Sequence, residues 1–139
     1  MHKEKPTKVY TGKSATDTNK KTFKPPLGIA HFLEHKMFET EDGVDPFTFF
    51  SESGTDSNAS TSFDHTQYIC SGTKKFRENL RYLLKFVNSP YYTDENVNKE
   101  KGIIAEEINM YQDIPDYKLE MKIREAVYTN SPRSIDIAG

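Results

Sequence analysis

The residues best suited to chemistry lie in one short segment, His31-Phe32-Leu33-Glu34-His35. If this segment is helical, at about 100° per residue, His31 and His35 stack on one face and Glu34 lies beside them. Neutral imidazoles are good zinc ligands, and a carboxylate that is not a ligand can act as a general base. The spacing therefore predicts half of a catalytic zinc site. The alternative is a surface helix with two unrelated histidines.

A catalytic zinc site needs a third protein ligand besides an open position. In the helix that Thr93 is expected to cap, which runs to about Asp113, Glu100 and Glu107 lie within an apolar face. Glu106 points about 100° away from Glu107. Because an unpaired carboxylate on an apolar face is costly, we expect Glu107 to have a partner inside the protein. The same holds for Glu100 unless it reaches solvent near the helix end.

Composition limits the classes of protein to consider. The 139 residues suffice for one modest domain, with 35% hydrophobic and 29% charged residues. A formal net charge of −2 argues against a nucleic-acid-binding protein that relies on overall charge. The single cysteine, Cys70, excludes a disulfide framework and a cysteine-based zinc site. Since no apolar run approaches a membrane span and no signal peptide is recognised, we expect a cytoplasmic protein without membrane association.

Residues 1–24 form a polar, basic segment with seven lysines and two acidic residues. Such a segment is typical of a solvated chain end, and the less favoured alternative is a site for an anionic partner. We therefore place the predicted domain at residues 25–139.

Helices and strands must position the chemical groups. Pro25 and Pro26 precede the first helix, which is expected from Leu27 to Phe38. Asp45 and Pro46 are typical of the start of a second, short helix. Two further helices show apolar residues at helical spacing. The first has Phe76, Leu80, Leu83, Leu84 and Val87, and the expected core face of the second is Leu119, Ile123, Ala126 and Val127.

Two strands are predicted at 57–63 and 66–70, separated by Asp64 and His65. The first strand is small and polar, so it is expected to be an exposed edge that can pair with an extended peptide. His65 is expected to be a turn residue, with a role as third zinc ligand as the less favoured alternative.

Taken together, these segments resemble the insulinase/pitrilysin family of zinc metallopeptidases, the inverzincins, and most clearly its bacterial zinc protease branch. Residues 28–35 look like the catalytic helix, 57–62 like the substrate-edge strand, and 100–108 like the segment that supplies the third ligand. Residues 131–139 resemble the stretch that follows. The resemblance covers residues 25–139 and implies an α+β fold, with helices packed on a mixed or antiparallel sheet.

The resemblance also implies a role for each matching residue. His31, His35 and Glu107 would bind Zn2+, and Glu34 would be the general base that activates a zinc-bound water. Glu100 would assist without binding the metal. The expected function is therefore a zinc endopeptidase that cleaves peptides or unfolded protein segments.

Substrate and partners follow from the same resemblance. Asn58 and Ala59 match positions where the edge strand pairs with substrate backbone. Family members also have a homologous second half that encloses the substrate, so this sequence looks like an amino-terminal fragment of an incomplete catalytic domain. The alternative is a non-catalytic peptide-binding or partner subunit that retains the fold. A purely structural zinc is less favoured, because such sites usually have four ligands with cysteine among them.

Overall fold

The computed structural model describes residues 25–139, so the predictions for residues 1–24 lie outside the described part of the chain. The fold is α+β with an antiparallel sheet, as predicted. The elements in chain order are α1 (Ile29–Lys36), α2 (Pro46–Glu52), β1 (Asp56–Thr61), β2 (Thr66–Ser71), α3 (Phe76–Val87), α4 (Asp94–Gln112), α5 (Pro115–Val127) and the 3-10 helix η1 (Pro132–Ser134).

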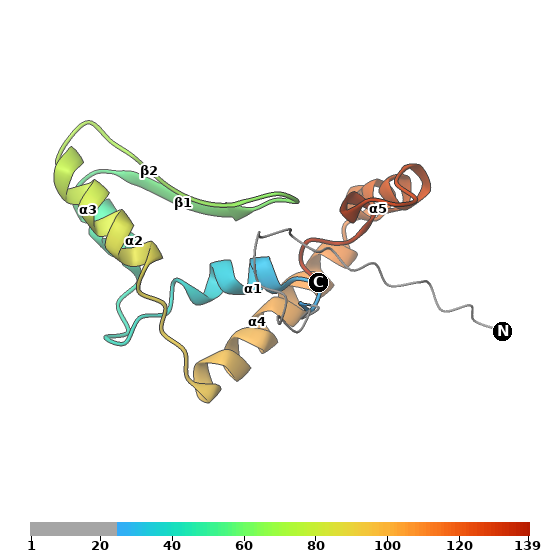
Figure 1. Ribbon diagram of the computed structural model, residues 1–139, viewed down its shortest axis with the longest axis horizontal. Helices are drawn as coiled ribbons and strands as arrows, with labels where there is room; N and C mark the ends of the chain where they lie inside the picture. Colours follow the sequence, from blue (N-terminus) through green and yellow to red (C-terminus); the bar gives the residue numbers. More distant parts are fainter. Residues whose placement is uncertain (1–24) are drawn as a thin grey trace, which may run out of the picture.

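Helix α1 lies between the hairpin and α4 (Figure 1). The β1–β2 hairpin runs along one side of α1, and α4 crosses its other side. Helices α2 and α3 pack against one end of the hairpin, and α5 lies beyond its tip, in contact with α4 and η1. Side chains of α1 can therefore meet groups from both a strand and a second helix.

The hairpin pairs residues from Asp56↔Ser71 to Thr61↔Thr66. Alternate residues of β1 are half-buried and the others exposed, as expected for a strand with one covered face. The first strand ends at Thr61, before the predicted Phe63, because the Ser62 amide already bonds to the His65 carbonyl at 2.8 Å and closes the turn. His65 is an exposed turn residue, as expected, and pairs with Asp64.

Helix ends follow local chemistry. Asp45 accepts a hydrogen bond from the Phe47 amide at 2.8 Å, and Thr93 forms a reciprocal capping box with Asn96. Helix α1 begins two residues later than predicted and ends at Lys36 rather than Phe38. Its start is fixed at Gly28, which has a φ of +73° and lies against the Ala138 carbonyl, where any Cβ would collide.

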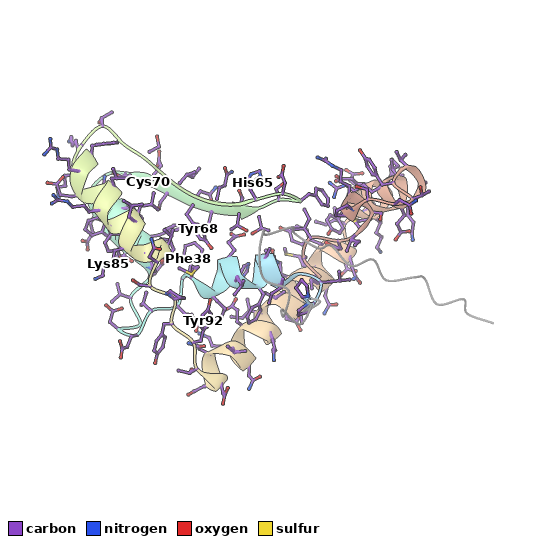
Figure 2. The ribbon with its side chains drawn as sticks, in the orientation of Figure 1. Phe38, His65, Tyr68, Cys70, Lys85 and Tyr92 are labelled. Atoms are coloured by element: carbon purple, nitrogen blue, oxygen red, sulfur yellow. The ribbon has the colours of Figure 1, made fainter. Side chains whose placement is uncertain are left out.

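The buried core is small and aromatic. Phe50, Phe86 and Ile104 are its buried apolar side chains within residues 25–139. Phe38 and Tyr68 lie close together where the end of α1 meets the hairpin (Figure 2). The rings of both lie 5.4 Å from that of Phe86. This cluster attaches α1 and α3 to the hairpin.

The apolar faces of α3 and α5 are largely open, which for α5 corrects the sequence expectation. On α3, Phe76 and Leu84 are 72% and 54% exposed, whereas Asn79 and Phe86 are buried. On α5, the predicted core face is open, with exposed fractions of 60% at Leu119, 53% at Ile123 and 65% at Val127. Periodicity identified both apolar faces, but residues 25–139 leave that of α5 open and cover that of α3 only in part, at Leu83 and Val87. Over the same residues, no helix is long and apolar enough to cross a membrane.

Candidate metal centre

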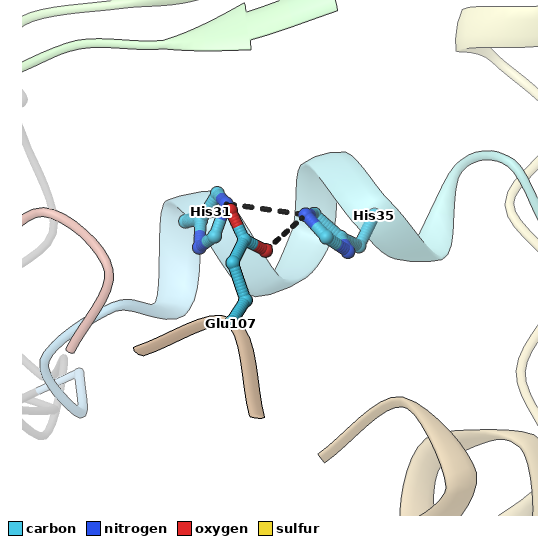
Figure 3. Close-up of side chains that lie close together, drawn as sticks. All are labelled: His31, His35 and Glu107. Carbon is cyan, nitrogen blue, oxygen red and sulfur yellow. Dashed lines mark hydrogen bonds and ion pairs between the residues drawn. The ribbon is translucent and has the colours of Figure 1, made fainter. Parts of the chain in front are cut away.

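Two helices bring three metal-ligand side chains together (Figure 3). His31 and His35 lie one turn apart on α1, with their Nε2 atoms 3.1 Å from each other. Glu107 approaches from α4, with Oε2 3.3 Å from His35 Nε2 and Oε1 3.7 Å from His31 Nε2. Its neighbour Glu106 is exposed. The two Nε2 atoms and the Glu107 carboxylate therefore converge on one point between the helices.

The separations of these donor atoms fit a zinc ion. Two ligand atoms of a tetrahedral zinc, each about 2.0–2.1 Å from the metal, lie about 3.3 Å from each other. The distances of 3.1, 3.3 and 3.7 Å bracket this value. Two imidazoles and a carboxylate are also a donor set that catalytic zinc sites use. Among residues 25–139, no other three such side chains lie close enough to share a metal ion.

The two histidines differ in how their second ring nitrogen is held. His35 Nδ1 lies 2.9 Å from Oε1 of Glu100, which is only 5% exposed. Such a pairing fixes the ring so that Nε2 faces the cluster. His31 Nδ1 is buried, and no side chain or backbone group within residues 25–139 bonds to it. Glu100 therefore holds the ring of His35 and is not itself one of the three clustered side chains.

Glu34 lies beside the cluster and is buried, at 8% exposure. Its Oε2 accepts a hydrogen bond of 2.6 Å from the Thr61 hydroxyl of β1, and the Thr66 hydroxyl lies 3.1 Å from that of Thr61. Burial, with the nearby Glu34 carboxylate adding to it, raises the pKa of Tyr68 to about 12, so this phenol is neutral at physiological pH.

A cleft of about 430 Å³ brings Glu34 together with the predicted substrate strand. Its walls are Glu34, His35, Phe38, Glu39, Phe47, Asn58, Ala59, Lys99 and Glu100. Asn58 Oδ1 accepts the Ala59 N–H at 2.9 Å, so the side chain of Asn58 satisfies a backbone donor that an incoming peptide could use. A second cavity, of about 210 Å³, is lined by His31 and Glu107 on the other side of the cluster.

A charge network around Glu39 and Lys99 forms one wall of the cleft. Lys36 is fully buried, and its Nζ lies 2.5 Å from Oε2 of Glu39, whose other oxygen is 3.3 Å from Lys99 Nζ. Burial raises the pKa of Glu39, but the hydrogen bonds and charges of Lys36 and Lys99 outweigh it and leave that pKa below its usual value. Glu39 is therefore ionised at neutral pH and neutralised from both sides.

Sequence reasoning missed Thr61 and Lys36. Thr61 could have been found from the period of two, because it lies on the same face of β1 as Ala59. Lys36 gave no such signal, since a lysine in the last turn of a helix is ordinarily solvated. Only the packing of the end of α1 encloses it.

Comparison with known proteins identifies the family. The sequence model described as "Insulinase (Peptidase family M16)" matches residues 20–139. This chain belongs to the insulinase family, M16. The predicted resemblance is therefore confirmed, and the family is one of peptidases. The division of the chain at residue 25 stays a prediction.

Bacterial relatives of this M16 chain are named as zinc proteases. It is 53% identical over 114 residues to the uncharacterized zinc protease YmfH of Bacillus subtilis (strain 168), covering 82% of this chain and 26% of the relative. It is 34% identical over 119 residues to YmxG, another uncharacterized zinc protease of that strain, and the match covers 81% of this chain and 28% of YmxG. The Escherichia coli (strain K12) protein named probable zinc protease PqqL is 31% identical over 116 residues, and the match covers 76% of this chain and 12% of PqqL. The chain thus spans about a quarter of the length of the two B. subtilis relatives.

Proposed function

We propose that this M16 chain forms the zinc-binding part of an endopeptidase that cleaves peptides or unfolded protein segments. The observation that carries the proposal is the convergence of His31 Nε2, His35 Nε2 and the Glu107 carboxylate, at 3.1 to 3.7 Å. Glu107 is the proposed third ligand, because Glu106 is exposed on another side of α4.

The chain's own residues divide the remaining work. Zinc, when bound, polarises the scissile carbonyl and makes a water molecule more acidic. Glu34 takes the proton from the attacking water, for which its position in the cleft wall is suitable. Glu100 keeps His35 oriented through its 2.9 Å contact with Nδ1.

The substrate is proposed to lie along the edge of β1. Asn58 and Ala59 share the cleft with Glu34, so a peptide paired with this edge would pass the proposed base. The polypeptide that the longer relatives have beyond the matched region is proposed to enclose the substrate from the other side. The cytoplasmic location expected from the sequence stays a prediction.

Zinc content tests the proposal directly. The purified chain is analysed for metal by mass spectrometry, beside the variants His31→Ala and His65→Ala. We expect about one zinc per chain, lost in His31→Ala and kept in His65→Ala, whose exposed histidine lies in the hairpin turn. Folded chain without zinc would overturn the assignment of the ligands.

Hydrolysis separates the enzyme from the alternative function. The zinc-loaded chain is incubated with a mixture of unfolded peptides, and new amino termini are counted. Cleavage that a chelator abolishes supports the endopeptidase. Bound zinc and bound peptide without cleavage would instead support a non-catalytic peptide-binding subunit.

A further inference from the structure

We propose that Thr61 is a positioning residue, whose hydroxyl holds the Glu34 carboxylate at the wall of the cleft. This inference rests on the proposed role of Glu34 as general base. It links two parts of the site, because β1 would then both pair with the substrate and orient the group that activates water.

The contact itself is short and specific. Thr61 Oγ1 lies 2.6 Å from Glu34 Oε2, within the range of about 2.5–2.7 Å that is typical of a hydroxyl donating to a carboxylate. The Thr66 hydroxyl, 3.1 Å from that of Thr61, is a polar neighbour on the paired strand. Glu34 itself is only 8% exposed, so solvent does little to orient it. The Thr61 hydroxyl therefore has a charged acceptor in a place where water is largely excluded.

The strand that carries Thr61 is anchored at its tip. Phe63, two residues further along, lies under the guanidinium of Arg124 at 4.8 Å and that of Arg133 at 5.6 Å, measured to the ring centroid. Cation–π contacts of this kind attach the hairpin turn to α5 and to η1. Thr61 is thus held between a paired strand and an anchored turn, and its hydroxyl is in a fixed position relative to α1.

Thr61 lies next to both cavities of the candidate site. Thr61 and Ala59 occupy the half-buried face of β1, and Ala59 lines the cleft together with Glu34. Thr61 in turn lines the second cavity, beside His31 and Glu107. A substrate paired with β1 would therefore lie on the same strand that holds Glu34 through the Thr61 hydroxyl.

Three variants of the full chain isolate this hydrogen bond. Thr61→Val removes the hydroxyl and keeps the shape, Thr61→Ser keeps the hydroxyl, and Thr66→Val removes the neighbouring hydroxyl while leaving Glu34 untouched. The side-chain carboxyl 13C signal of Glu34, assigned by its absence in Glu34→Gln, is recorded for each zinc-loaded variant. Zinc content, kcat and KM for peptide hydrolysis are measured on the same samples.

We expect Thr61→Val to keep one zinc per chain, to shift the Glu34 signal and to lower kcat about 10-fold with KM unchanged. In Thr61→Ser, the Glu34 signal and kcat should stay as in the unaltered chain. Thr66→Val should also change neither. An unmoved Glu34 signal in Thr61→Val, or a kcat equal to that of the unaltered chain, would overturn the proposal. Failure of the proposed function is a different result, since the unaltered chain would then lack zinc or activity. The Glu34 signal still decides whether Thr61 holds this carboxylate.

Discussion

Polar side chains are buried near the candidate site, whereas apolar side chains are exposed on the outer faces of α3 and α5. Near the site, charged side chains are buried, with exposed fractions of 0% at Lys36, 5% at Glu100 and 8% at Glu34. On α5, no residue is buried, and Leu119 is 60% exposed. In these two regions, polar side chains are therefore buried while apolar ones are exposed.

The difference has a physical cause. A buried charge is stable only when a partner lies within hydrogen-bonding distance, so its partners have to be built into the immediate surroundings. An apolar face gains stability from any apolar surface that covers it, whichever element provides that surface. The site can thus be complete in its contacts while the two apolar faces remain in solvent.

The largest expected effect lies at Glu34. Glu34→Gln should keep one zinc per chain and lower hydrolysis by about 10²- to 10⁴-fold, in this chain or in a longer active form, because the amide cannot accept the proton. Metal content and the initial rate of peptide cleavage measure the two properties on one sample. Retained hydrolysis would remove Glu34 from the role of base.

The next effect separates two adjacent carboxylates on α4. Glu107→Gln should weaken zinc binding by more than about 100-fold, a loss beyond that expected for an outer partner of a ligand. Glu106→Gln is the matched control and should leave the affinity unchanged, because its side chain is exposed. Competition with a chromogenic chelator measures the zinc dissociation constant of each variant. Equal losses in the two variants would show that the face assignment of α4 is wrong.

A smaller effect is expected at the buried lysine. Lys36→Met keeps the aliphatic stem but leaves Glu39 with Lys99 alone, so we expect a loss of about 1–2 kcal/mol in the free energy of unfolding at pH 7. Because the pKa of Glu39 is lowered on folding, the pair stabilises the protein fully above pH 4.5, the ordinary value for Glu. This contribution is lost as the pH falls through the lowered pKa.

Urea unfolding at several pH values tests this prediction. The difference between the unaltered chain and Lys36→Met should be largest at neutral pH and should narrow as the pH falls below 4.5. A difference that stays constant down to pH 3 would mean that the ion pair with Glu39 does not cause it.

A last pair of variants compares two isoleucines, one in each region, and includes the smallest expected effect, at Ile123. Ile104 is 7% exposed on α4, and Ile123 is 53% exposed on α5. Ile104→Ala should lower the free energy of unfolding by about 2–5 kcal/mol, since it leaves a cavity. Ile123→Ala should change it by less than about 0.5 kcal/mol. Similar losses at both positions would show that the face of α5 is covered in solution.

The sequence was informative wherever spacing alone decides geometry. His31 and His35 share a face of α1 because residues four apart on a helix do so in any fold. Helix geometry also predicts that Glu107 faces the protein interior and Glu106 does not, and in the structure Glu107 is half-buried and Glu106 exposed. Helix starts at Asp45 and Thr93 were also predictable, because a cap depends on groups two or three residues away. Strand pairing followed from a short turn between two strands with high β-propensity.

Tertiary structure alone decided which distant groups meet. No spacing places Thr61 against Glu34, Glu100 against His35 or Lys36 inside the protein, because these contacts depend on how α1 packs between the hairpin and α4. Likewise, the sequence marks the apolar face of α5, but burial depends on what lies opposite that face. Periodicity is a property of one element, whereas a contact between elements is a property of their packing.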